Sequence, residues 1–210
     1  MLSEARRARA SGAQNGNMTR INGKIYAAAA VSAALGMALL LPALAGAAGG
    51  PSLQDKVKTA FIYKFTKYVH WPGGEPAEEF RIAVIGDSSI VGPLRELAKA
   101  PPAEGRRIKL QLAGSADEIG SCHILVIAAS ERSRLREILK KIEGKSVLSV
   151  GEVAGMAARG AVLDFVLVDG RLRFQINRRA AERAGLQISS ELLKLAILVE
   201  EQEGARDVEP

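Results

Sequence analysis

Hydrophobic side chains between Val57 and Val69 recur at the spacing that places them on one face of an α-helix. The lysines of this segment lie largely off that face. Pro72, followed by two glycines, is a sequence that ends helices. The pattern therefore predicts an amphipathic helix, whose apolar positions are Val57, Phe61, Ile62, Phe65, Tyr68 and Val69.

Strands alternate with helices through the middle of the chain. The run 122–127 is apolar throughout, as in a central parallel strand, whereas 107–112 alternates basic and apolar residues and predicts a half-exposed strand. This alternation favours a mainly parallel sheet with helices on its faces. The predicted elements are strands at 80–85, 107–112, 122–127 and 146–150, a helix through Leu94 and Leu97, and a helix at 135–142 that Gly144 caps.

The last third of the chain has a different pattern. Asp169-Gly170 separates apolar runs at 161–168 and 171–176, which predicts a β-hairpin. Asn177 is a good N-cap and Gly185 a good C-terminal cap for a short helix between them. A final helix is expected at 188–199, apolar on most sides, and therefore either deeply buried or paired with another chain. The expected fold is a single α/β domain with a mainly parallel (mixed) sheet flanked by helices, a C-terminal β-hairpin and two helices.

Residues 18–48 have the order of a secretory signal: a short basic segment, an uncharged apolar stretch from Ala27 to Leu41, and small residues around Ala45. The alternative is a membrane anchor, but the stretch is shorter than the roughly 20 residues that span a bilayer. We expect a cleaved signal peptide at 1–47, with Met18 as a candidate start. The α/β domain is then expected at 48–200 and an acidic disordered tail at 201–210.

The leader changes the meaning of the chain's charge. The whole chain carries a formal charge of +6, but residues 1–45 hold five basic side chains and one acidic side chain. The remainder has 24 basic against 22 acidic residues, a net charge of +2. Nucleic-acid binding usually needs a strongly basic, clustered surface, so this class of function is not expected.

The residue types needed for catalysis or metal binding are sparse. His70 and His123 are the only histidines and stand far apart, so no metal site and no cofactor are expected. No Gly-x-Ser-x-Gly turn is present, and we expect no enzyme activity. The turn Gly86–Ser89 is either a phosphate-binding helix entry or, more simply, a strand exit with capping hydroxyls. Cys122, the only cysteine, is expected to be buried, or else to pair between chains.

Two surfaces are candidates for binding a partner or a ligand. Aromatic residues gather between Phe61 and Trp71, where Tyr63 and the Trp71-Pro72 pair need not belong to the core. Arg171 and Arg173 point to one face of their predicted strand, away from Leu172, Phe174 and Ile176. For both surfaces, ordinary packing or solvation is the alternative interpretation.

Several segments between residues 55 and 200 together resemble the YfiR-like family of periplasmic proteins. The last segment, from Arg173-Phe174-Gln175-Ile176-Asn177 to Leu195-Ala196, is the best match. Two departures are that Asp164 stands where Asn is usual, and that Cys122 has no second cysteine as a mate, so redox control is not expected. The other segments are Lys58–Val69 with Trp71-Pro72, Phe80–Asp87, and Gly151-Glu152 with Gly155-Met156-Ala157 and Gly160.

The resemblance implies a non-catalytic periplasmic protein, often a homodimer, that acts as a negative regulator through protein–protein interaction. The expected function is to bind and repress an inner-membrane signalling enzyme, such as a diguanylate cyclase, which lowers cyclic di-GMP and biofilm formation. The alternative is a periplasmic small-ligand-binding module that serves a sensor kinase or receptor, with a pocket near Trp71, Arg173 and the 151–160 loop. The candidate binding residues are Tyr63, Trp71, Pro72, Glu152, Arg171, Arg173 and Asn177.

Overall fold

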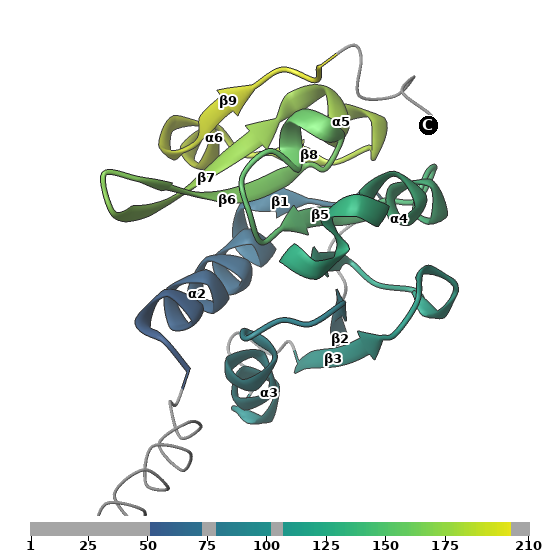
Figure 1. Cartoon of the computed structure of the whole chain (residues 1–210), viewed down its shortest axis with the longest axis vertical. Coiled ribbons are helices and arrows are strands. Elements are labelled where there is room, and N and C mark those ends of the chain that lie inside the picture. The colour runs from purple at the N-terminus through teal and green to yellow at the C-terminus, as the bar shows by residue number, and fades with distance from the viewer. Residues whose placement is uncertain (1–50, 73–78, 102–106, 203–210) are drawn as a thin grey trace, which may run out of the picture. The chain divides into compact units, whose positions relative to one another are not determined.

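The computed structural model describes residues 51–72, 79–101 and 107–202 (Figure 1). The signal peptide expected at 1–47 and all but the first two residues of the expected acidic tail lie outside these described residues. Within them, no helix is both long enough and apolar enough to cross a bilayer.

Helices and strands follow the predicted alternation, with small shifts at their ends. The helices are α2 (Leu53–Tyr68), α3 (Val91–Lys99), α4 (Leu135–Lys141), α5 (Arg178–Arg183) and α6 (Ser190–Leu195). The strands are β1 (Val69–His70), β2 (Glu79–Ile85), β3 (Arg107–Ala113), β4 (Ile124–Ile127), β5 (Leu148–Gly151), β6 (Leu163–Val168), β7 (Arg171–Asn177), β8 (Gln187–Ile188) and β9 (Ile197–Val199).

A seven-stranded sheet in the order β3-β2-β4-β5-β6-β7-β9 forms the centre of the domain. All neighbouring strands in it are parallel except β6 and β7. A separate two-stranded antiparallel sheet pairs β1 with β8. The predicted mainly parallel, mixed sheet is therefore confirmed.

Each face of the sheet is buried under its own helices because successive side chains of a strand point to opposite faces. Ile82 and Val84 of β2 pack in a cluster with Ile62 and Phe65 of α2. Ala83 and Ile85, the alternate residues of the same strand, pack with residues of α4. The core thus consists of two apolar layers with the sheet between them.

Helix α2 begins with a reciprocal cap. The Ser52 hydroxyl accepts a hydrogen bond from the Asp55 backbone N–H at 3.1 Å, and the Asp55 carboxylate accepts one from the Ser52 N–H at 3.1 Å. The helix ends at Tyr68, earlier than Pro72, because the backbone from Val69 is extended and pairs with β8. In Figure 1, α2 leads directly into β1.

The predicted hairpin and the short helix after it are confirmed. Asp169 and Gly170 both have positive φ, 49° and 71°, as a tight hairpin turn requires. Val168 pairs with Arg171 across this turn. Asn177 caps α5 through its side-chain oxygen, which accepts from the Ala180 N–H, and Gly185 follows the helix with a φ of 67°.

The single helix expected at 188–199 is wrong. The segment divides into the end of β8, the short helix α6, and the strand β9, which lies parallel to β7 at the edge of the sheet. The backbone becomes extended at Ala196, and the β-branched Ile197 and Val199 favour a strand where the edge of β7 offers backbone partners. Of the two alternatives expected for this segment, deep burial does not hold, since Leu195 is 62% exposed, and pairing with another chain stays a prediction.

Candidate functional site

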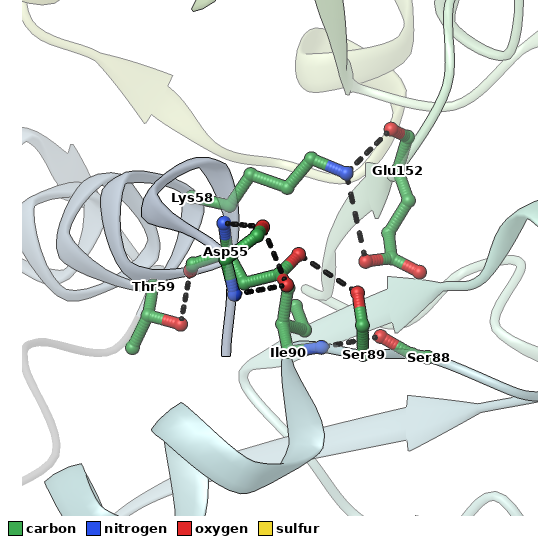
Figure 2. A network of polar contacts seen from close by, with 8 residues as sticks. Asp55, Lys58, Thr59, Ser88, Ser89, Ile90 and Glu152 are labelled. Atoms are coloured by element: carbon green, nitrogen blue, oxygen red, sulfur yellow. Dashed lines mark hydrogen bonds and ion pairs between the residues drawn. The ribbon is translucent and has the colours of Figure 1, made fainter. Parts of the chain in front are cut away.

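The chain runs from β2 to β3 and from β4 to β5, and β3 and β5 lie on opposite sides of the adjacent pair β2 and β4. The loops that leave β2 and β4 therefore diverge at the carboxyl ends of these strands. In open α/β sheets a switch point of this kind is where ligands usually bind. In this chain the first turns of α2 lie against it: the Ser89 hydroxyl donates to Asp55 Oδ1 at 2.7 Å (Figure 2). We call Asp55, Lys58, Ser88, Ser89 and Glu152 the carboxyl-edge network.

Asp55 joins the cap of α2 to the loop after β2. Partial desolvation acts to raise the pKa of Asp55, but hydrogen bonds from Ser52 and Ser89 outweigh it and lower that pKa. The Ser88 hydroxyl accepts from the Ile90 N–H at 3.3 Å. Both serine hydroxyls of this turn therefore serve contacts within the protein, as the simpler interpretation of a strand exit with capping hydroxyls predicted.

Glu152 follows β5 and is the predicted binding residue that lies in this network. Lys58 of α2 approaches it twice, with Nζ 3.8 Å from Glu152 Oε1 and 3.2 Å from its carbonyl oxygen (Figure 2). Both side chains are largely buried, 16% exposed for Lys58 and 5% for Glu152. Burial raises the pKa of Glu152, and the Lys58 charge and a Ser88 hydrogen bond only partly oppose this.

Two further buried polar residues, Asn177 and Asp164, bind the backbone of Ala157, in the loop after β5. Asn177 is fully buried and donates from Nδ2 to the Ala157 carbonyl at 2.8 Å, while its oxygen caps α5. Asp164, also fully buried, accepts from the Ala157 N–H at 2.9 Å. Burial raises the pKa of Asp164 against the opposing backbone N–H groups at 155–157. The side chain of Asn177 is thus committed to the fold.

The tip of the β6–β7 hairpin carries an exposed surface that is both basic and apolar. Arg171 and Arg173 are exposed, and neither forms an ion pair with another described residue. Leu167 and Val168 on the adjoining strand are 54% and 38% exposed. Val168 pairs with Arg171 and shares the face of the two arginines, whereas Leu167 pairs with Leu172 on the opposite face of the hairpin tip. We call these four residues the hairpin surface, and the face with the two arginines is the basic strand face that the sequence predicted.

The aromatic candidates have a different environment. Trp71 is only 6% exposed, and its ring packs edge-on against Phe80, with centroids 5.1 Å apart. Tyr63 is half-buried with Lys67 Nζ 5.6 Å from its ring centre, and Pro72 is exposed. For Trp71, packing in the core is the interpretation that the structure favours.

Trp71 and Arg173 lie at opposite ends of the strands. Trp71 contacts Phe80, the second residue of β2, and His123, which directly precedes β4. Trp71 therefore lies at the amino ends of these strands. Arg173 pairs with Val166, two residues beyond Asp164, which pairs with the last residue of β5. Trp71 therefore does not line one pocket together with Arg173 and the 151–160 loop, as the sequence had led us to expect.

Lys58, Asp55 and Ser89 were not among the predicted site residues. The pattern Ser52-x-x-Asp55 is a recognisable capping box and could have marked the start of α2. Their contacts with Ser89 and Glu152 had no local signal, since they join residues 34 and 94 positions apart.

Metal and thiol chemistry find little support in the described part of the chain. No group of three or more His, Cys, Asp or Glu side chains is placed there to hold a metal ion. Cys122 is a free thiol and is 8% exposed. Burial raises the pKa of this thiol to about 11, which keeps it protonated and unreactive.

Comparison with known proteins gives one match that covers most of the domain. The model of the YfiR/HmsC-like family matches residues 55–197. A search of the curated proteins finds no match.

Solved structures match more weakly. An ABC domain in complex with L-Trp from Streptococcus pneumonia is 12% identical with a TM-score of 0.45, over 57% of this chain and 55% of that one. A conserved domain protein from Vibrio cholerae is 14% identical with a TM-score of 0.48, over 70% of this chain and 60% of that one. This chain thus spans little more than half the length of either.

Proposed function

The chain belongs to the YfiR/HmsC-like family, and from that premise we propose that it is a periplasmic regulatory protein that binds and represses an inner-membrane signalling enzyme. We propose a diguanylate cyclase as this enzyme, so that binding lowers cyclic di-GMP and biofilm formation. The protein itself then catalyses no reaction, and its effect depends on contact with the periplasmic part of its partner.

The hairpin surface is the observation that best supports a partner-binding role. Arginine and exposed aliphatic side chains on a projecting two-stranded element are typical of a protein contact, because the apolar groups add burial and the charges select the partner. Val168 is exposed on the same face as Arg171 and Arg173, which lack ion-pair partners among the described residues, and Leu167 is exposed on the opposite face of the same tip. This surface suits a partner with an acidic, partly apolar face.

The genetic test is deletion of the gene followed by complementation. Deletion should raise cyclic di-GMP, and the wild-type gene should restore the low level. The reversed-charge variant Arg171→Glu/Arg173→Glu should fail to restore it, because the charge that selects the partner is inverted. The matched control is Lys56→Glu/Lys64→Glu, which changes the same charge on exposed positions of α2 and should complement fully.

Two outcomes would contradict the proposal at different levels. Unchanged cyclic di-GMP after deletion would exclude a diguanylate cyclase as the partner. Full complementation by the hairpin variant, with the protein present at wild-type amounts, would exclude the hairpin surface as the contact. The homodimer implied by the family stays a prediction, which light scattering on the purified protein can test.

A further inference from the structure

A cavity of about 490 Å³ lies away from both the carboxyl-edge network and the hairpin surface. Its walls come from α4 and the turn after it, from residues beside the starts of β5 and β6, from α5, and from Glu201. This volume is within the range of roughly 300–1,000 Å³ that is usual for small-molecule sites.

The floor of the cavity is apolar. Ile142, Val147 and Val162 are at most 7% exposed, and their side chains line the cavity together with Leu139. Ser149 also contributes, but its hydroxyl oxygen already accepts from the Val162 N–H at 2.9 Å. The floor therefore offers contact for a hydrocarbon body and few groups for hydrogen bonding.

The rim of the cavity is basic. Among the described residues, five basic side chains line it, against two acidic ones, Glu143 and Glu201. Glu201 is engaged by one of the five, since Arg183 Nη2 lies 2.7 Å from its carboxylate. Lys140 and Lys145 are exposed and form no ion pair with another described residue. Basic side chains in excess beside an apolar floor attract an anion and not a cation.

A glycine lies between two walls of the cavity. Gly160 has a φ of 106°, a conformation that other residues rarely adopt. A Cβ atom there would lie 3.4 Å from both Leu139 Cδ1 and Glu201 Oε1, between two walls of the cavity. The wall that contains Glu201 is held in place, because the Gln202 N–H donates to the Ala158 carbonyl at 3.0 Å.

From these features we propose that the cavity binds a small amphipathic anion. Its apolar body would lie on the floor formed by Leu139, Ile142, Val147 and Val162, and its carboxylate, phosphate or sulfonate would lie at the rim near Lys140 and Lys145. The proposal does not depend on the identity of the signalling partner, because it rests on the shape, lining and charge of the cavity alone.

A pair of fluorescent probes separates the two parts of this proposal. Anilinonaphthalene sulfonate and N-phenylnaphthylamine share the same aromatic body, but only the first carries an anion. The sulfonate probe should bind the purified protein saturably at one site, with a blue-shifted emission. The neutral probe should bind at least about threefold more weakly, since it lacks the attraction of the rim.

The variant Lys140→Gln/Lys145→Gln should weaken the sulfonate probe roughly three- to tenfold and leave the neutral probe unchanged. The matched control Lys56→Gln/Lys64→Gln removes two exposed charges from α2 and should leave both dissociation constants unchanged. A filled cavity, made by Ala184→Leu, should weaken both probes. Equal affinity for the two probes would overturn the proposal, and so would an unchanged dissociation constant of the sulfonate probe in the Lys140/Lys145 variant. Both results can be obtained without the Ala184→Leu variant, so the test holds even where that variant fails to fold.

Discussion

The ion pair between Lys58 and Glu152 allows a prediction in which the two single substitutions have very different costs. At a separation of 3.8 Å, the attraction is about 4 kcal/mol at an effective dielectric constant of about 20. Desolvation costs several kcal/mol for each buried ion and opposes it. The raised pKa of Glu152 indicates that, for the carboxylate, desolvation outweighs the attraction.

Lys58→Met should lower the free energy of unfolding by about 3 kcal/mol at pH 8, because it leaves a nearly buried carboxylate without its cation. Glu152→Gln should change this free energy by less than about 1 kcal/mol, since the desolvation cost of the carboxylate disappears together with the attraction, and Lys58 is the more exposed of the two ions. Lys58 would still donate to the carbonyl of residue 152, at 3.2 Å in the wild type. The double variant should recover most of the loss seen in Lys58→Met.

The pH dependence provides an independent check on this reasoning. When the pKa of a carboxyl group is raised in the folded state, the group destabilises the fold as the pH rises. For Glu152 this loss begins near 4.5, the ordinary pKa of the group, and is complete above the raised pKa. The cost of Lys58→Met should therefore be small near pH 4.5 and increase toward pH 8. Urea denaturation of the four proteins at several pH values measures this. Equal losses for Lys58→Met and Glu152→Gln, or a cost that does not vary with pH, would refute the argument.

Four further predictions concern single features. Because burial raises the pKa of Asp164, this residue should lower wild-type stability as the pH rises from 3.8, its ordinary pKa, through the raised value; Asp164→Asn should reduce that slope in urea denaturation, leaving the part that Glu152 contributes, and an unchanged slope would contradict the assignment. Trp71→Phe should cost only about 1–2 kcal/mol, against about 3–5 for Trp71→Ala, because the buried indole N–H has no hydrogen-bond partner among the described residues; circular dichroism during thermal unfolding measures both, and equal costs would argue otherwise. Cys122 should react with a thiol reagent only after denaturation, so rapid labelling of the native protein would show that it is accessible. Finally, N-terminal sequencing of the protein from the periplasm should find a start close to Gly46, and an intact Met1 or Met18 would refute cleavage of the leader.

Local signals in the sequence were enough for most of the fold. The alternation of buried strands with helices predicted the parallel sheet, and Asp169-Gly170 predicted the hairpin. The error at 188–199 has a physical cause, since the run from Leu192 to Val199 is apolar enough for either a helix or a strand. Strand β9 forms only because β7 offers its free edge, and this edge comes from tertiary structure that periodicity does not reveal.

The candidate site was predictable only in part, because its contacts join distant segments. Glu152 was expected to bind a partner or ligand, yet the residue beside it is Lys58, which no local motif marked. Arg171 and Arg173 could be assigned to an exposed face because a strand alternates its side chains between two sides. The burial of Trp71 depended on Phe80 and His123, whose positions follow from the strand order and not from the neighbouring sequence.

The pairing of β1 with β8 has a consequence for how the protein is made. Val69 pairs with Ile188, and the Ser189 N–H donates to the Tyr68 carbonyl, so the C-terminal end of α2 is anchored by the last part of the chain. During synthesis, α2 is complete before any strand of the large sheet exists, so Ile62 and Phe65, which pack against that sheet in the finished protein, are uncovered until the sheet forms. A holding chaperone that recognises apolar segments should therefore act on this helix during biogenesis until the strands of the sheet cover it, and the pairing of β1 with β8 then completes its anchoring.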